Sequence, residues 1–188
     1  MASDRRIKYT KMVLRESLIT LLRDKPISRI TIKELCEHAD INRATFYTHY
    51  ADQFDLLKKI EEEFITDITS YLDNFVLEED DTGLTQMILK MIEYIEKNKE
   101  LCRVLLGPNV DTDFQSEIMQ IVRERIILEW RKKRAVDEET ADYIYTYAAT
   151  GSIGVIRKWL FDENTKSAKE MAVFVTRLVN KGLEAFIG

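Results

Sequence analysis

Apolar residues recur along the chain at the three- and four-residue spacing of amphipathic helices, which predicts an all-α fold of about nine helices. Charged and polar runs, caps and Gly or Pro residues separate the segments. The expected helices run over about 5–24, 32–39, 43–50 and 53–76, then one around 84–95, a shorter one ending near 107, and finally 113–134, 137–161 and 167–187.

Composition supports a helical chain and excludes several other classes. Only 6 Gly and 2 Pro occur in 188 residues, which are too few turn-forming residues for a fold of many strands. Cys36 and Cys102 lie far apart and form no CxxC pair, so we expect no disulfide framework, no metal site and no cofactor. No nucleotide-binding or catalytic motif is present, and no segment is apolar enough to span a membrane. We therefore expect a cytoplasmic protein that is not an enzyme.

Two short helices joined by a tight turn are predicted between residues 31 and 50. Thr31 is a suitable N-cap, and Glu34, three residues later, completes a capping box. The pattern stops at Asp40, a residue type that accepts the left-handed conformation of a tight turn. Asn42 then caps the second helix. This arrangement is typical of a helix-turn-helix.

The second of these helices carries an unusual density of hydrogen-bonding side chains. They are suited to phosphate and base edges in a major groove: Asn42, Arg43, Thr45, Tyr47, Thr48 and His49. The packing face is expected to comprise Ile41, Ala44, Phe46 and Tyr50. A surface helix of an arbitrary bundle would use Lys and Glu for solubility, so this composition favours double-stranded DNA as a partner.

The charge distribution supports the same interpretation. The formal net charge of −5 hides a basic N-terminal third, in which residues 1–60 hold 12 Lys and Arg against 8 Asp and Glu. The remaining residues are acidic. A basic module on an acidic body is expected of a small DNA-contacting domain.

The last two helices are apolar around most of their circumference. Residues 143–156 form fourteen consecutive uncharged positions. Such helices need cover on two sides, which predicts a homodimer interface, although a central core helix of a monomer would show the same pattern. The interface residues that we expect are Tyr147, Gly151, Val155, Phe174, Val175 and Leu178.

The region from about residue 5 to 60 resembles the DNA-binding domain of the TetR family of bacterial transcriptional repressors. The residues that carry the resemblance are Thr31, Leu35, Cys36, Ala39, Ile41, Asn42, Thr45, Tyr47, His49, Tyr50, Leu56 and Leu57. The resemblance implies that Thr31 and Tyr47 contact phosphate, and that Arg43, Thr45 and His49 contact base edges or phosphates. Asp40 stands where the family usually has glycine, and Gln53 stands where many relatives have a phosphate-binding lysine.

The rest of the chain resembles the C-terminal domain of a TetR subgroup that is common in Gram-positive bacteria. Two short signatures carry this resemblance: Leu105–Pro108 followed by Asp113–Phe114, and Gly151–Gly154 followed by Trp159–Leu160. We therefore expect a helix-turn-helix domain over 1–52 and an effector-binding and dimerisation domain over 53–188. The effector is expected to be a small molecule or a protein co-regulator. The residues that could line a cavity for it, or could instead form an ordinary hydrophobic core, are Phe64, Ile68, Met87, Met91, Tyr94 and Tyr145.

Several patterns leave alternatives open. The basic run Arg131–Arg134 is either a second nucleic-acid patch or a set of cations favoured at a helix C-terminus. His38 is expected at the surface, and the Gly151–Gly154 segment is interpreted as close helix packing. The main functional alternative is a helical adaptor or enzyme accessory protein that docks another protein and does not bind DNA. A docking helix would be expected to expose Leu or Met anchors, which the segment 42–50 lacks.

Overall fold

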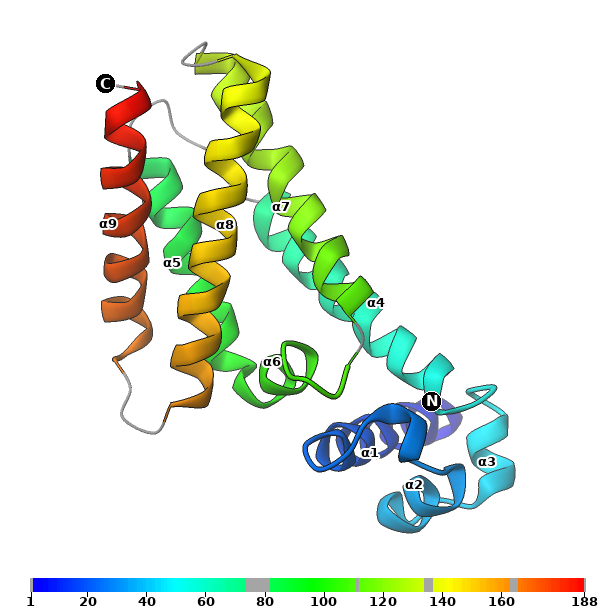
Figure 1. The fold of residues 1–188 in the computed structure, drawn as a ribbon. Coiled ribbons are helices and arrows are strands. Elements are labelled where there is room, and N and C mark those ends of the chain that lie inside the picture. Colours follow the sequence, from blue (N-terminus) through cyan, green and yellow to red (C-terminus); the bar gives the residue numbers. More distant parts are fainter. Residues whose placement is uncertain (1, 74–81, 111, 134–136, 163–165, 188) are drawn as a thin grey trace. The chain divides into compact units, whose positions relative to one another are not determined.

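The computed structural model of the chain describes residues 2–73, 82–110, 112–133, 137–162 and 166–187. These residues form nine α-helices, one short 3₁₀ helix and no strand, which confirms the all-α prediction (Figure 1). The helices are α1 (Ala2–Leu22), η1 (Ile27–Arg29), α2 (Ile32–Ala39), α3 (Arg43–Tyr47), α4 (Gln53–Asp73), α5 (Thr82–Lys97), α6 (Lys99–Leu105), α7 (Thr112–Lys133), α8 (Glu138–Phe161) and α9 (Ala168–Ile187).

Residue contacts divide the chain into two compact units. The N-terminal unit comprises Met1–Thr66 together with Glu100–Thr112, and the C-terminal unit comprises Asp67–Lys99 together with Asp113–Gly188. Helix α4 therefore contributes residues to both units. These contact-based units do not coincide with the predicted domains, because the first part of α4 and the segment 100–112 belong to the unit that contains the helix-turn-helix. The functional division at residue 52 stays a prediction.

In the N-terminal unit, α1 packs against α2, and α2 packs against α3. Leu14, Leu18 and Leu22 follow one another at four-residue intervals on α1 and are almost completely buried. Leu35 from α2 and Phe46 from α3 are buried in the same unit. One apolar stripe on α1 thus forms the base on which the two short helices are held.

The segment Glu100–Thr112 joins this unit through the C-terminal end of α1. The Asn109 side-chain amide donates to the Leu22 carbonyl oxygen at 2.9 Å, and Arg23 forms an ion pair with Glu100 at 2.5 Å. The last carbonyl groups of a helix lack partners within the helix, so an amide donor from elsewhere in the chain satisfies one of them. Sequence periodicity gave no sign of this long-range contact.

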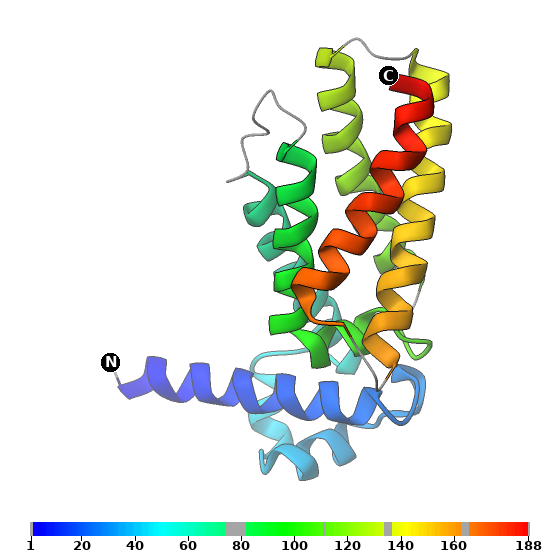
Figure 2. The ribbon, with the colours of Figure 1, turned by 90° about the vertical axis from the view of Figure 1, so that its left-hand side faces the viewer.

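In the C-terminal unit, α9 packs against α5 and against α8, and α8 and α9 run antiparallel (Figures 1 and 2). Trp159 near the end of α8 is buried, and its indole N–H donates to the Lys166 carbonyl oxygen at 2.7 Å. Helix α7 is tied to α8 by the Arg123–Asp142 ion pair at 2.7 Å. Within the described parts of the chain, no helix is both long enough and apolar enough to cross a membrane.

Local details differ from the sequence expectations in three places. Helix α3 ends at Tyr47 instead of continuing to residue 50, and the Thr48 hydroxyl donates to the Thr45 carbonyl oxygen at 2.6 Å. Such side-chain bonds compete with helix continuation. The 3₁₀ helix η1 was not expected. Gly151 and Gly154 have open space where a Cβ atom would lie, so the described residues do not form the predicted close packing around them.

Candidate nucleic-acid interface

The turn between α2 and α3 has the geometry predicted from Asp40. Its φ of 52° and ψ of 43° place it in the left-handed region, and it is the one described non-glycine residue with a positive φ. The backbone N–H of Ile41 donates to the Cys36 carbonyl oxygen at 2.9 Å, which closes the end of α2. Aspartate tolerates this conformation better than most residues, so the turn forms without glycine.

Both short helices begin at the predicted caps. The Thr31 hydroxyl oxygen accepts a hydrogen bond from the Glu34 backbone N–H at 3.2 Å, and the Asn42 side-chain oxygen accepts one from the Ala44 backbone N–H at 2.8 Å. The Glu34 carboxylate is paired with the Lys25 ammonium and also accepts from the Thr31 backbone. These contacts, with Lys25 the larger, lower the pKa of Glu34. The capping box is therefore confirmed.

Helix α3 buries one side and exposes the other. Phe46 is 0% exposed, whereas Tyr47 is 57% exposed and Arg43 is also exposed. Arg43 and Tyr47 are four residues apart, so their side chains share one helix face. The Phe46 ring contacts Tyr47 edge-on and also Tyr50, with ring centroids 5.6 and 5.7 Å apart. Burial of Tyr50 raises the pKa of its hydroxyl.

The remaining predicted contact residues all belong to the N-terminal unit, with differing accessibility. Thr48 is exposed, while Thr45 and His49 are half-buried, and Thr31 and Asn42 are exposed at their cap positions. Ala44, which we expected on the packing face, is exposed. The reason is that Phe46 is the one buried residue of this five-residue helix, and Ala44, two positions earlier, lies on the opposite helix face.

An open hollow of about 570 Å³ lies where α2 meets α3. Asn42 and Arg43 line it together with Lys33 and Glu37 of α2. Lys33 and Glu37 were not among the candidate residues predicted from the sequence, although their four-residue spacing places them on one helix face. Lys33 is therefore a further cation beside the predicted contact residues.

The six residues predicted to form an effector pocket are divided between the units. Phe64 lies in the N-terminal unit, and the other five lie in the C-terminal unit. In the latter, the Tyr94 hydroxyl donates to Asp67 at 3.2 Å. The Tyr145 hydroxyl donates to the Met119 carbonyl oxygen at 2.6 Å, and burial raises the pKa of Tyr145 to about 12. Ile68 and Met87 are buried and Met91 is half-buried, while an effector pocket stays a prediction.

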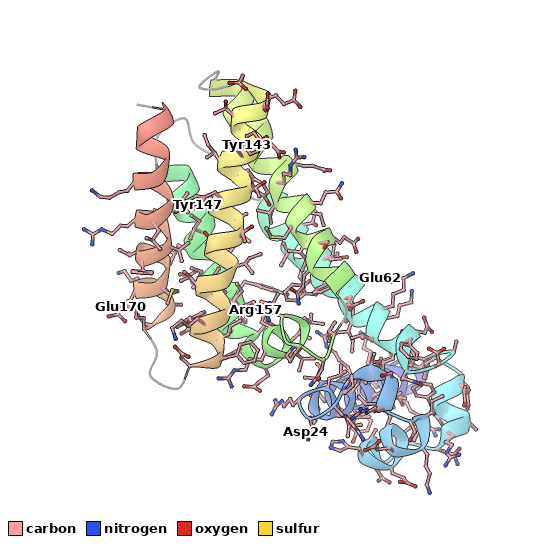
Figure 3. The ribbon with its side chains drawn as sticks, in the orientation of Figure 1. Asp24, Glu62, Tyr143, Tyr147, Arg157 and Glu170 are labelled. Carbon is pink, nitrogen blue, oxygen red and sulfur yellow. The ribbon has the colours of Figure 1, made fainter. Side chains whose placement is uncertain are left out.

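An apolar groove of about 600 Å³ lies between α8 and α9. Five of the six predicted interface residues line it: Tyr147, Gly151, Val155, Val175 and Leu178. Phe174 is exposed but does not line the groove. Tyr143 and Tyr147 follow each other along α8 and are strongly exposed (Figure 3). Val175 is only 2% exposed, so its side chain already packs within its own chain.

His38 and the two cysteines are not among the candidate interface residues. His38 is exposed, as expected, and its Nδ1 atom lies 3.0 Å from the Ser17 hydroxyl oxygen. Cys36 and Cys102 are buried free thiols, and burial raises the pKa of Cys102 to about 12. The described residues contain no group of three side chains suited to a metal ion. The side chains of the basic run Arg131–Arg134 lie outside the described residues.

Comparison with known families decides the identity of the chain. Residues 82–181, slightly more than half of the sequence, match a TetR family model described as the C-terminal region of transcriptional regulators. The chain belongs to the TetR family. It is therefore a transcriptional regulator and not an enzyme.

Two sequence relatives cover most of this chain, and one of them is named as a transcriptional regulator. The HTH-type transcriptional regulator YxbF of Bacillus subtilis is 22% identical over 180 residues, which cover 89% of this chain and 44% of the relative. This TetR-family chain thus spans less than half the length of that protein. The nucleoid occlusion factor SlmA of Alteromonas mediterranea is 26% identical over 176 residues, covering 82% of this chain and 88% of the relative.

Solved structures support the fold. A TetR transcriptional regulator from Streptococcus agalactiae superposes with a TM-score of 0.66 at 21% identity, covering 95% of this chain and 98% of the other. At this identity the likeness establishes the shared fold alone. The two chains therefore share one all-helical fold.

Proposed function

We propose that this TetR-family chain is a dimeric repressor that binds a near-palindromic DNA operator through α3. The observation that carries the proposal is the exposed face of α3, where Arg43 and Tyr47 lie side by side. Phe46 fixes that face from the buried side. A helix that presents a guanidinium and a phenol on a rigid base is suited to a major groove.

The side chains are suited to separate roles. Tyr47 and Thr31 are assigned to phosphate oxygens, which fix the position of the protein on any sequence. Arg43 is assigned to a base edge, since its planar guanidinium can donate two hydrogen bonds to guanine. Asn42, Thr45, Thr48 and His49 complete the contact surface.

The groove between α8 and α9 supports a dimer. Its lining is apolar, and Tyr147 and Leu178 beside it are exposed in the single chain. A large exposed apolar surface is unfavourable in water, and a second copy would cover it by two-fold symmetry. The open space at Gly151 would allow a partner helix to approach α8 closely. Two-fold symmetry in turn predicts half-sites about one helical turn, 34–36 Å, apart.

Release from DNA is assigned to a ligand or protein bound by the C-terminal unit. An effector that binds more tightly to the conformation with the lower DNA affinity must weaken DNA binding, and DNA weakens effector binding by the same coupling free energy. That energy is usually about 1–3 kcal/mol, or about 5- to 150-fold in affinity. Function on DNA also implies a cytoplasmic location.

Selection of binding sites from random DNA tests the proposal. We expect enrichment of a near-palindrome by the full chain. On the selected site, Tyr47→Phe and Thr31→Ala should weaken binding to all base-substituted sites alike, whereas Arg43→Ala should also relax preference at particular base pairs. Absence of any enriched sequence would favour the alternative, a helical adaptor that docks another protein.

A further inference from the structure

The first turns of α1 form a strongly cationic surface. Arg5, Arg6, Lys8 and Lys11 are all exposed. Asp4 is the one acidic residue among the first fifteen of the sequence. We call residues 5–12 the α1 basic segment.

This segment extends beyond the hydrophobic core of the N-terminal unit. Ile7 is in helical register with Leu14 and Leu18, which are both 0% exposed, yet Ile7 itself is 40% exposed. The start of α1 correspondingly projects beyond α2 and α3 (Figure 2). Thr10 is the one buried residue of the segment. The four cations stay exposed around it, so their charges are not explained by packing in the core of the unit.

Three cations of the segment, Arg5, Arg6 and Lys11, have no carboxylate partner among the described residues. Further along α1, Arg15 pairs with Glu63 at 2.6 Å. Across the part of the chain that the structure describes, no carboxylate lies within ion-pair distance of Arg5, Arg6 or Lys11. At roughly 100° per residue, Arg6 and Lys11 lie about 100° and 240° from Arg5 around the axis. Positive charge thus surrounds the segment on several sides.

This charge pattern fits a polyanion better than a membrane surface. A helix that lies on a membrane needs one continuous apolar face. Ile7 and Tyr9, both exposed, lie about 160° apart around the helix. The exposed Met12 lies about 60° from Tyr9, but Arg5 stands between them, so the three side chains form no continuous apolar face. Phosphate groups of DNA, in contrast, require only accessible cations. The segment belongs to the same compact unit as α3.

We propose that the α1 basic segment binds DNA phosphates that flank the half-site contacted by α3. The inference rests on the proposed DNA-binding function and adds a second contact surface to it. The contacts would be sequence-independent, so they would raise affinity and salt dependence without changing base preference. Gln53, which stands where many relatives have a phosphate-binding lysine, carries no charge, and the cations of the segment would add phosphate contacts of the kind that this position lacks.

The test compares the salt dependence of operator binding by full-length variants. Arg5→Ala/Arg6→Ala/Lys11→Ala removes the three unpaired cations. Lys169→Ala/Arg177→Ala/Lys181→Ala removes three exposed cations of α9, none of which lines the groove, and serves as a control of equal charge. Arg5→Lys/Arg6→Lys/Lys11→Arg keeps the charge. Binding is measured by fluorescence anisotropy on the selected operator between about 50 and 200 mM salt.

Each phosphate contact contributes about 0.9 to the slope of log K against log salt, or about 3.5-fold in affinity over this salt range. We expect the triple alanine variant to lose about 2–3 units of slope, with base preference and melting temperature unchanged. The α9 control and the charge-conserving variant should match the wild type on the operator.

The outcomes separate this inference from the proposed function. If the wild type selects no operator, the function fails. If the wild type binds its operator and the triple alanine variant keeps the full slope, the α1 contact alone is overturned. A variant that keeps the DNA slope but loses sedimentation with anionic phosphatidylserine vesicles would assign the segment to membranes and would likewise overturn the proposal.

Discussion

A single charge at Leu178 should dissociate the proposed dimer without unfolding the chain. Leu178 lines the groove between α8 and α9 and is 52% exposed in the single chain. Val173, on the same helix, is 49% exposed but does not line the groove. The two residues are therefore a matched pair, and we compare Leu178→Asp with Val173→Asp.

The magnitude follows from the area that a partner would cover. Complete burial of a leucine contributes roughly 1.5–3 kcal/mol. Since about half of Leu178 remains exposed, its further burial would contribute about 1 kcal/mol in each copy, or about 2 kcal/mol across a two-fold interface. An unpaired carboxylate in the groove costs several kcal/mol more. We expect the dissociation constant of the dimer to rise at least about 100-fold, since each 1.4 kcal/mol is tenfold.

Sedimentation velocity over a concentration series measures this constant for the wild type and both variants. Circular dichroism should show an unchanged helix content for both variants, because each side chain is about half exposed in the chain. Charge at Val175 is a poorer probe, since that residue is buried within its own chain and the substitution would damage its core. Equal effects of the two substitutions, or a wild type that is monomeric at micromolar concentration, would refute the proposed interface.

Three further predictions concern the N-terminal unit. Asp40→Gly should leave the free energy of unfolding nearly unchanged, whereas Asp40→Val should lower it by about 1–2 kcal/mol in denaturant titrations, because β-branched residues resist the left-handed conformation. Asn109→Asp should destabilise the unit by about 1–3 kcal/mol more than Asn109→Ala, since a carboxylate would face the Leu22 carbonyl oxygen. Amide hydrogen exchange along α1 should report this loss of stability. The pKa of Glu34 is lowered, so its pairing with Lys25 stabilises the fold above pH 4.5 and this stabilisation is lost as the pH falls through the lowered pKa. Lys25→Met should therefore reduce the dependence of the melting temperature on acid pH.

The parts of the fold that depend on residues close together in the sequence are predictable from the sequence. Caps at Thr31 and Asn42 and the turn at Asp40 are local, because each uses backbone groups within a few residues. The burial of Phe46 followed from the alternation of polar and apolar residues in the same short segment. Local sequence therefore determines the caps, the turn and the buried anchor of the candidate interface.

Features that depend on distant residues could not be predicted in this way. The contact of Asn109 with Leu22 joins positions 87 residues apart, and nothing in the local pattern near either residue indicates it. Val175 and Leu178 have similar apolar side chains on one helix, yet one is buried in the chain and the other is half exposed. Periodicity shows which residues are apolar but not which neighbour covers them.

The ratio of the affinities for the selected operator and for a scrambled duplex of equal length tests the central claim most directly. Measured by anisotropy at one physiological salt concentration, the wild type should prefer the operator by at least about 10³-fold, the lower end of the range for specific DNA-binding proteins. Arg43→Ala should reduce this ratio by about 5- to 150-fold, corresponding to about 1–3 kcal/mol for a bidentate base contact. A ratio near one for the wild type would contradict sequence-specific DNA binding through α3.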